Sequence, residues 1–265
     1  MKGGISLSNN HLDKIVKKFD AIATEYQQGQ ARRLKEDMIL RLADPKPNDY
    51  VLDVATGTGA VLLTLATKVK VLVGLDVTST MLERAVDSFK SSEARPLFIT
   101  GNAEQIPVAN EMFDLVTCSR ALHHMEQPEL AISEMFRVLK SGGRLMILDN
   151  TTYENDEFAE KHNRLETMRD SSHHRTLPIS ELVERLQGVG FTVSSVLHDE
   201  VLRSLTAWFA DAGTDPKMEE QILKEIKSGQ QSGDPFYLQH FQEKADGEWT
   251  FRYQMVWLVA HKTSC

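Results

Sequence analysis

The sequence predicts an α/β protein: a doubly wound, mostly parallel sheet of seven strands, with an N-terminal helical cap and a C-terminal insertion. From Tyr50 onward, short runs rich in β-branched residues alternate with segments of helical periodicity, which is the pattern of βαβ crossovers. The chain has 265 residues and 41% of them are hydrophobic, so it can bury a sizeable core. We therefore expect a single domain over residues 1–265.

The elements expected before residue 150 form the cap and a ligand-binding half. Residues 1–43 are the expected cap, with one or two amphipathic helices over residues 12–43. Residues 44–150 are the expected ligand-binding half, and its strands are predicted at residues 50–54, 69–75, 96–100, 113–118 and 144–148. Its helices are predicted at residues 60–68, after a capping box at Thr80 and Glu83, and after Pro128.

The elements expected after residue 150 form a substrate-binding half over residues 151–265. A polar segment at residues 151–178 precedes a helix that runs from about Ser180 to Gly188. Two strands are predicted at residues 191–197 and 251–260. Between them, an insertion at about residues 203–248 is predicted to be helical in "PKMEEQILKEIK" and loose at "SGQQSGD".

Composition excludes several classes of partner. With 30 Lys+Arg against 38 Asp+Glu, the formal net charge is -8, so we expect no nucleic-acid partner. Cys118 and Cys265 are too few for a disulfide framework or a metal cluster, which fits a reducing cytosol. The N-terminus lacks the apolar core of a signal peptide, and no apolar window is long enough to cross a bilayer. We expect a cytoplasmic protein without membrane insertion, and the sequence does not indicate an oligomeric state.

The segment "VLDVATGTG" predicts a nucleotide-like ligand with a positive charge. A strand that enters a Gly-x-Gly turn and then a helix brings a ligand close to the main chain, although such glycines also occur simply for positive φ. The dinucleotide fingerprint needs a third glycine, and Leu62 stands in its place. Asp53, four residues before Gly57, would repel a pyrophosphate and attract a cation.

Two further strand ends complete the predicted ligand. Asp76 ends the second strand, where a carboxylate can accept hydrogen bonds from both hydroxyls of a ribose. After the third strand, Asn102 and the main chain at Ala103 can address an adenine edge. A ribose, an adenine and a cationic amino-acid part together describe S-adenosylmethionine.

These segments resemble the class I S-adenosylmethionine-dependent methyltransferases, specifically the small-molecule group that includes the ubiquinone and menaquinone C-methyltransferases. The resemblance covers about residues 44–150 in the family's order, through "VLDVATGTG", "VGLDVTSTML", "GNAEQIPV", "FDLVTCSRALHHM" and "EMFRVLKSGGRLMILD". It implies the Rossmann-like fold of that family. One departure is Asn102, where the family commonly has Asp, and an amide oxygen can still accept from the adenine amino group.

The resemblance also implies a set of cofactor-binding residues. Residues 57–59 and Asp53 would line the methionine part, Asp76 would hold the ribose, and Asn102 with Ala103 would face adenine. The segment "FDAIATEYQ" resembles the N-terminal helix that closes over the cofactor, although it can equally be an amphipathic helix packed on the sheet. The expected cofactor-binding residues are Tyr26, Asp53, Ala55, Gly57, Thr58, Gly59, Asp76, Val77, Met81, Asn102, Ala103, Glu104 and Ser119.

Histidines are the candidate catalytic residues. Methyl transfer from a sulfonium relies largely on alignment, and a hydroxyl or acidic carbon acceptor additionally needs a base, for which histidine suits neutral pH. His123 and His124 follow the fourth strand, and because they are adjacent we expect one of them to point inward. The alternative is that they shape this loop. Asp149, at the end of the fifth strand, can bind substrate, act as a base, or cap the next element.

A second histidine pair lies in "RDSSHHRTLP". Arg169, His173, His174 and Arg175 are candidates for a lid over an anionic or phenolic acceptor, with His173 as a catalytic candidate, and the alternative is a solvated loop. We expect no metal site, because the two pairs are far apart in sequence and lack the helical i, i+4 spacing of metal-binding histidines.

The function that these patterns favour is methyl transfer from S-adenosylmethionine to a small organic acceptor, with carbon or oxygen acceptors favoured by the family resemblance. An NAD-dependent dehydrogenase would need the missing third glycine and a Tyr-x-x-x-Lys pair. A nucleic-acid methyltransferase would show Asn/Asp-Pro-Pro-Tyr/Phe where this chain has "SRALHH". A non-catalytic protein that binds S-adenosylmethionine stays open.

Overall fold

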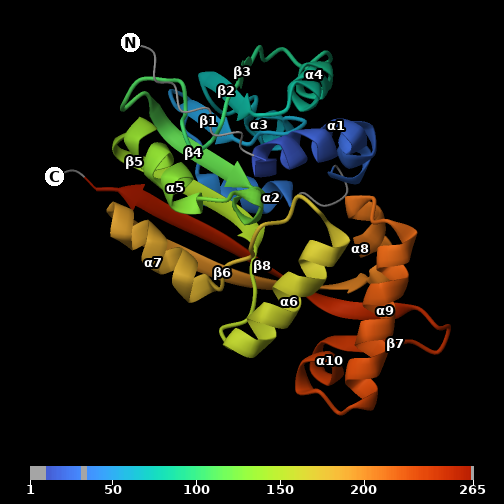
Figure 1. The fold of residues 1–265 in the computed structure, drawn as a ribbon. Coiled ribbons are helices and arrows are strands. Elements are labelled where there is room, and N and C mark those ends of the chain that lie inside the picture. Colours follow the sequence, from blue (N-terminus) through green and yellow to red (C-terminus); the bar gives the residue numbers. More distant parts are fainter. Residues whose placement is uncertain (1–9, 31–34, 264–265) are drawn as a thin grey trace, which may run out of the picture.

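A single twisted sheet organises the protein (Figure 1). The computed structural model describes residues 10–30 and 35–263, with side chains from residues 11–23 and 35–263. The strand order is β3-β2-β1-β4-β5-β8-β6, in which β1 to β5 run parallel and β8 is antiparallel to both neighbours. This path of seven strands confirms the expected doubly wound sheet. The short β7 pairs with β8 as an additional strand.

The bounds of the elements follow the predicted alternation closely in the first half. The strands are β1 (Tyr50–Val54), β2 (Val71–Asp76), β3 (Leu97–Thr100), β4 (Phe113–Ser119), β5 (Leu139–Asn150), β6 (Phe191–Ser204), β7 (Phe241–Glu243) and β8 (Trp249–Lys262). The helices are α1 (Asn10–Gln30), α2 (Glu36–Ala43), α3 (Ala60–Leu65), α4 (Ser79–Ser88), α5 (Pro128–Val138), α6 (Asp156–Arg169), α7 (Ile179–Val189), α8 (Leu205–Ala212), α9 (Pro216–Gln231) and α10 (Pro235–His240). A 3₁₀ turn, η1, spans Leu122–His124.

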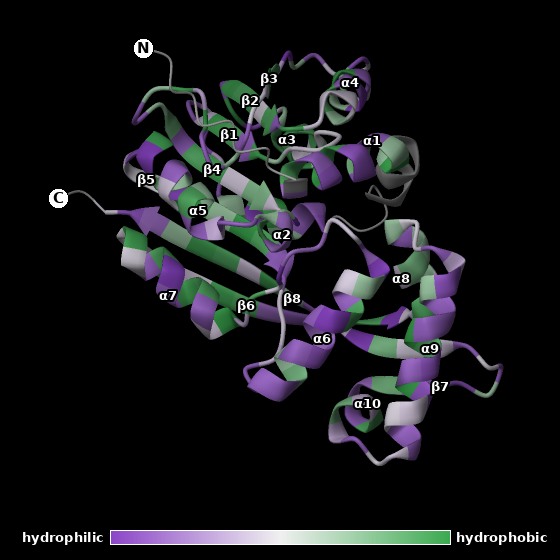
Figure 2. Ribbon diagram, in the orientation of Figure 1, coloured by the Kyte–Doolittle hydropathy of each residue, from purple (hydrophilic) through white to green (hydrophobic). Residues whose placement is uncertain are grey.

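The core lies on both faces of the sheet because side chains alternate along each strand. Leu52 and Val116 pack with the buried residues of α5 and α7 on one face. Val51 and Leu115 pack with α2, α3, α6 and the helices of the insertion on the other. Figure 2 shows much of β8 in the hydrophobic colour and much of α6 and α9 in the hydrophilic one. The strands are therefore buried between two helical layers.

The strand order reverses between β1 and β4. β1 pairs with β2 on one side and with β4 on the other, and the chain crosses to opposite faces of the sheet on leaving these strands. In open α/β sheets, ligands bind outside the carboxyl ends of the strands at this reversal. The fold thus brings the residues that follow β1, β2 and β4 to one edge.

The insertion contains more regular structure than expected. β6 continues to Ser204, seven residues beyond the predicted end, because it pairs with β8 along its whole length. The segment "SGQQSGD", predicted to be loose, belongs in part to α9, which runs to Gln231. A Cβ on Gly229 would lie 2.1 Å from Cδ2 of Tyr237, so glycine lets α10 pack against α9 here. The prediction was wrong because this packing overrides the weak helical propensity of Ser and Gly.

The predicted capping box at Thr80 was wrong. α4 begins at Ser79, with Thr78 as its N-cap residue. The backbone N–H of Thr78 donates to Oδ1 of Asp76 at 2.8 Å. A carboxylate at the end of the preceding strand thus satisfies a free N–H near the helix start, and the helix begins two residues earlier than the box implied.

Candidate active site

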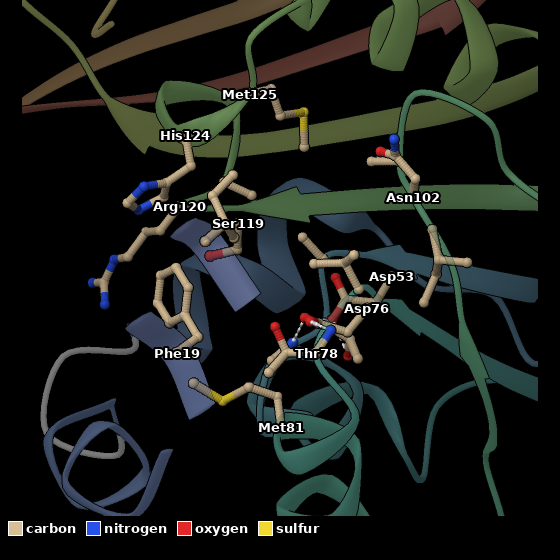
Figure 3. Close-up of a pocket in the computed structure, with 18 of the residues that line it drawn as sticks. Phe19, Asp53, Asp76, Thr78, Met81, Asn102, Ser119, Arg120, His124 and Met125 are labelled. Atoms are coloured by element: carbon tan, nitrogen blue, oxygen red, sulfur yellow. Dashed lines mark hydrogen bonds between the residues drawn. The ribbon is translucent and has the colours of Figure 1, made fainter. Parts of the chain in front are cut away.

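A cavity lies at the carboxyl ends of β1, β2 and β4, under α1. It encloses about 820 Å³ including its open mouth, a size suited to a small-molecule ligand. Figure 3 shows Asp53 and Asp76 together on one side of it, and Phe19, Arg120 and His124 gathered on another. Ten of the predicted site residues line this first cavity: Asp53, Ala55, Gly57, Asp76, Val77, Met81, Asn102, Ala103, Ser119 and His124.

The turn after β1 is tightly constrained. Gly57 and Gly59 have positive φ angles of 54° and 78°, and Ala55 has a φ of 55°, which is uncommon for a residue with a side chain. A Cβ on Gly59 would lie 3.3 Å from Cβ of Ala85, so this glycine lets the turn approach α4. Gly57 lines the cavity, whereas Thr58 and Gly59, which were also predicted to bind the cofactor, do not.

Asp76 holds this turn in place. One of its carboxylate oxygens accepts from the backbone N–H of Gly57 and the other from that of Thr78, both at 2.8 Å. Burial raises the pKa of Asp76 above its ordinary value, although these hydrogen bonds oppose the shift. The carboxylate therefore sits where β2 ends, at the wall of the cavity.

Asp53 is a buried carboxylate beside a second one. Its oxygens accept from the hydroxyls of Thr117 at 2.6 Å and Thr56 at 2.7 Å. Burial raises the pKa of Asp53 to about 6, against the effect of these hydroxyls, and the charge of Asp76 raises it further. A ligand with a positive charge in this cavity would relieve this effect, which fits a sulfonium or an ammonium group.

Apolar side chains line other parts of the first cavity. Met81 lies beside Thr78, whereas Asn102 and Met125 lie apart from it on other sides of the space, and Ala103 also lines the cavity. Oδ1 of Asn102 accepts from the backbone N–H of Glu104 at 2.9 Å, and the side chain of Glu104 turns toward the backbone N–H of Gln127 at 3.2 Å. Glu104 thus organises the loop, whereas Asn102 faces the cavity and keeps one lone pair and its amide donors for a ligand.

A second cavity adjoins the first. It encloses about 1190 Å³ including its open part, and Phe19, Arg120 and His124 line both cavities. Arg120 has a φ of 55°, an unusual value for arginine, and its backbone N–H donates to the carbonyl of Leu148 at 2.7 Å. The residues of the second cavity are Phe19, Ile22, Lys35, Arg120, His123, His124, Asn150, Arg169, Asp170, Asp199, Val201, Arg203, Asp211, Tyr253, Met255 and Trp257.

His123 is held by Asp149 at the wall of the second cavity. Its Nδ1 lies 2.5 Å from Oδ1 of Asp149, and its Nε2 lies 3.2 Å from Nδ2 of Asn150. The carboxylate can only accept a hydrogen bond, so Nδ1 carries the hydrogen and Nε2 is the basic nitrogen of this ring. Asp149 also accepts from the backbone N–H of Leu122 at 2.8 Å, which ties the histidine turn to β5.

His124 lies where the two cavities meet. Its Nδ1–H donates to the carbonyl of Ser172 at 3.0 Å, and the ring of Phe19 meets it edge-on with centroids 5.2 Å apart. Burial lowers the pKa of His124 to about 4, so the ring is neutral at neutral pH. We expected one histidine of this pair to point inward; the 3₁₀ turn directs His123 to the second cavity and His124 to both.

The structure gives the four residues predicted as a lid different surroundings, and the ring of His174 meets that of His11 edge-on with centroids 5.4 Å apart. Arg169 lines the second cavity, whereas Arg175 forms an ion pair with Glu181 on the surface. His173 packs behind the cavity, with Nε2 3.0 Å from Oδ1 of Asn163, and burial lowers its pKa to about 2. Its ring centroid lies 5.8 Å from that of His123. His173 thus supports the histidine turn from behind.

Sequence reasoning missed most of the second cavity. Its walls combine α1, the end of α6, and strands β6 and β8, which are far apart in the chain. Arg120 carried a signal, because an arginine directly after a buried strand at the ligand edge is unusual. The predicted Tyr26 lies in α1, and its side chain falls outside the described residues.

Within residues 10–30 and 35–263, no three His, Cys, Asp or Glu side chains are grouped so that they could hold a metal ion. The same part of the chain contains no helix that is both long and apolar enough to span a bilayer.

The fold and the two adjoining cavities define an enzyme of the doubly wound α/β class. Its first cavity suits a nucleotide-like ligand and lies where the strand order reverses. The family model described as a methyltransferase domain matches residues 52–147. A protein of Bacillus halodurans C-125 classed as a methyltransferase is 30% identical, with a TM-score of 0.82, over 87% of this chain and 99% of that one. The chain belongs to the S-adenosylmethionine-dependent methyltransferase family.

Two curated relatives align over different shares of the chain. The uncharacterized methyltransferase YcgJ of Bacillus subtilis (strain 168) is 28% identical over 71% of this chain and 75% of that protein. The ubiquinone/menaquinone biosynthesis C-methyltransferase UbiE of Rhizobium meliloti (strain 1021) is 35% identical over 54% of this chain and 58% of that protein. The match to UbiE thus spans little more than half of each protein.

Proposed function

We propose that this methyltransferase uses the first cavity for S-adenosylmethionine and the second for a small organic acceptor, which it methylates on carbon or oxygen. The observation that carries the proposal is the junction of the two cavities at Phe19, Arg120 and His124. A donor and an acceptor placed in the two cavities would meet at this junction. In-line transfer requires such an approach and little further chemistry.

The residues of the first cavity suit the parts of S-adenosylmethionine. The main chain at Gly57 and the buried carboxylate of Asp53 would receive the methionine part, Asp76 the ribose hydroxyls, and Asn102 with Ala103 the adenine edge. When bound, the sulfonium supplies an activated methyl group. Phe19 and the apolar side chains of the cavity would exclude water from the junction.

His123 is the proposed base for an acceptor that must lose a proton. Asp149 holds its Nδ1–H, which orients the ring and would stabilise the charge that forms when Nε2 takes a proton. The amide of Asn150 now contacts Nε2, so a bound acceptor would have to replace that contact. His124, held neutral, would orient the acceptor rather than titrate. A catalytic role for His173 stays a prediction, and its position favours support of His123.

The names of relatives and the composition support the remaining parts of the proposal. A carbon acceptor is favoured by the names of relatives such as UbiE, and these match only about half of the chain. Cytoplasmic location and the absence of a nucleic-acid partner stay predictions from composition.

The test is to incubate the protein with methyl-labelled S-adenosylmethionine and a metabolite extract, and to search for a labelled product by mass spectrometry. We expect a labelled small molecule that is lost in His123→Ala but formed by the wild-type protein. Tight binding of S-adenosylhomocysteine with no labelled product over a broad extract would contradict turnover. Binding of NADH in place of S-adenosylhomocysteine would contradict the cofactor assignment.

A further inference from the structure

The second cavity contains a guanidinium held by buried partners. Arg169, at the end of α6, is 8% exposed, and its Nε and Nη2 lie 2.9 and 2.8 Å from Oε2 of Glu166. Its Nη1 donates to the carbonyl of Trp208 at 3.2 Å, and the guanidinium lies over the indole of Trp208 at 5.0 Å from the ring centroid. Four contacts with two residues therefore fix the plane of this side chain.

Glu166 is dedicated to this arrangement. It is fully buried, and although burial alone would raise its pKa, the charge of Arg169 and a hydrogen bond from His162 hold that pKa well below its ordinary value. Its Oε1 also accepts from Nε1 of Trp208 at 3.2 Å. A buried ion pair of this kind rarely stabilises a fold more than apolar packing would. A requirement for the Arg169 guanidinium in the cavity wall is therefore a reason for this position to hold an ion pair.

Arg169 keeps hydrogen-bonding capacity on the cavity side. A guanidinium has five N–H donors, and the contacts to Glu166 and Trp208 use three of them. One N–H on each terminal nitrogen is left, in the fork arrangement that binds two oxygens of a carboxylate or one anionic oxygen. Because Arg169 lines the second cavity, these donors are available to a molecule bound there.

Four other charged residues of this cavity form two ion pairs. Lys35 pairs with Asp199, and Arg203 pairs with Asp211 and lies over the ring of Tyr253. Each of these pairs is neutral, as is the pair of Arg169 with Glu166.

The remaining charged residues on the wall, besides the histidines, are Asp170 and Arg120. Asp170 accepts through Oδ1 from the backbone N–H and the hydroxyl of Ser172, at 2.9 and 2.6 Å. Arg120 stands at the junction with the first cavity. Apolar surface in the same cavity comes from Ile22, Val201, Tyr253, Met255 and Trp257.

We propose that Arg169 determines acceptor specificity by binding an anionic oxygen, a carboxylate or a phenolate, on an acceptor whose apolar body packs against Tyr253, Met255 and Trp257. This inference rests on the proposed function, because it takes the second cavity as the acceptor site. Arg169 would hold one end of the molecule while the other end lies at the junction near His123 and His124.

The experiment measures binding of three nitroaromatic probes in the presence of saturating S-adenosylhomocysteine: the anions 4-nitrobenzoate and 4-nitrophenolate, and the neutral 4-nitrobenzamide, which has the shape of the benzoate. Nitroaromatic probes quench tryptophan emission, and Trp257 lines the cavity. We expect at least one of the two anions to bind the wild-type protein tenfold or more tightly than the amide. The anion that shows the preference identifies which oxygen chemistry the site takes.

Variants then assign the preference to Arg169. In R169Q we expect the anion and the amide to bind within about twofold of each other, and in R175Q, which removes a surface arginine paired with Glu181, the tenfold preference should persist. Because R169Q leaves Glu166 buried without its partner, the double variant E166Q/R169Q provides a folded alternative, checked by circular dichroism. R169K should keep the charge and lose most of the preference.

The outcomes separate this inference from the proposed function. Equal binding of anion and amide by the wild-type protein, no binding of either anion, or an unchanged preference in the variants would overturn the role of Arg169. Calorimetry with S-adenosylhomocysteine alone tests the first cavity independently. If the wild-type protein does not bind S-adenosylhomocysteine, that result would contradict the cofactor assignment instead.

Discussion

The pKa of Asp53 leads to a quantitative prediction about cofactor binding. The free protein has this pKa raised to about 6, because the carboxylate is buried beside Asp76. A cationic ligand favours the ionised carboxylate, so binding should release a proton at acidic pH. The affinity for S-adenosylhomocysteine, whose α-amino group stays charged below neutrality, should therefore fall as the pH decreases through about 6.

The magnitude follows from the two ionisation states. If the ligand returns the pKa of Asp53 to about 4, roughly nine tenths of the free protein is protonated at pH 5, whereas most of the complex is ionised. The dissociation constant at pH 5 should then be roughly tenfold higher than at pH 7, which corresponds to about 1.4 kcal/mol. Isothermal titration calorimetry at pH 5, 6 and 7 measures this change.

Two variants separate Asp53 from other titrating groups. Asp53→Asn should bind more weakly at pH 7 and show a shallower pH dependence; some dependence should persist, since burial also raises the pKa of Asp76. Asp114→Asn is the matched control, because Asp114 pairs with Lys140 away from both cavities and should leave the pH dependence unchanged. An affinity that is flat from pH 5 to 7, or a dependence as steep in Asp53→Asn as in the wild-type protein, would refute the reasoning.

Three further predictions concern single residues. Asp76→Ala should weaken S-adenosylmethionine binding by about 1–3 kcal/mol in calorimetry, because ribose hydroxyls would lose a buried acceptor; unchanged affinity would contradict its assignment. His123→Ala and Asp149→Asn should each lower turnover by roughly 100-fold or more while sparing cofactor affinity, and His124→Ala should differ sharply from both; three equal, negligible effects would reduce the pair to structural roles. Gly59→Ala should lower stability in chemical denaturation by about 1–2 kcal/mol, since its φ is 78° and Ala85 is close; an unchanged midpoint would contradict the strain.

The cofactor half was predictable because its signals are local. Asp53, Gly57 and Asp76 each follow or end a strand whose apolar run is visible in the sequence, and parallel strands bring their carboxyl ends together. The start of α4 was not predictable from the capping box at Thr80. The carboxylate of Asp76, in the preceding strand, accepts a hydrogen bond from the backbone N–H of Thr78, and the helix begins after that residue.

The acceptor half was less predictable because its contacts are long-range. Arg169 and Tyr253 are 84 positions apart in the printed sequence, and no periodicity links them. The role of Asp149 in holding His123 depends on the pairing of β4 with β5, which sets the distance between the two turns. The aromatic residues of the insertion pack in one core cluster with Tyr253 and Trp257, and these two, from the strand predicted at residues 251–260, also line the second cavity.

Phe19 forms part of the roof of both cavities, and α1 is tied down beyond it, since Nε2 of His11 bonds to the carbonyl of His124 at 2.8 Å. One helix thus contributes to the walls of both cavities. A substitution that shifts this helix should therefore change the binding of cofactor and acceptor together, rather than that of one ligand alone.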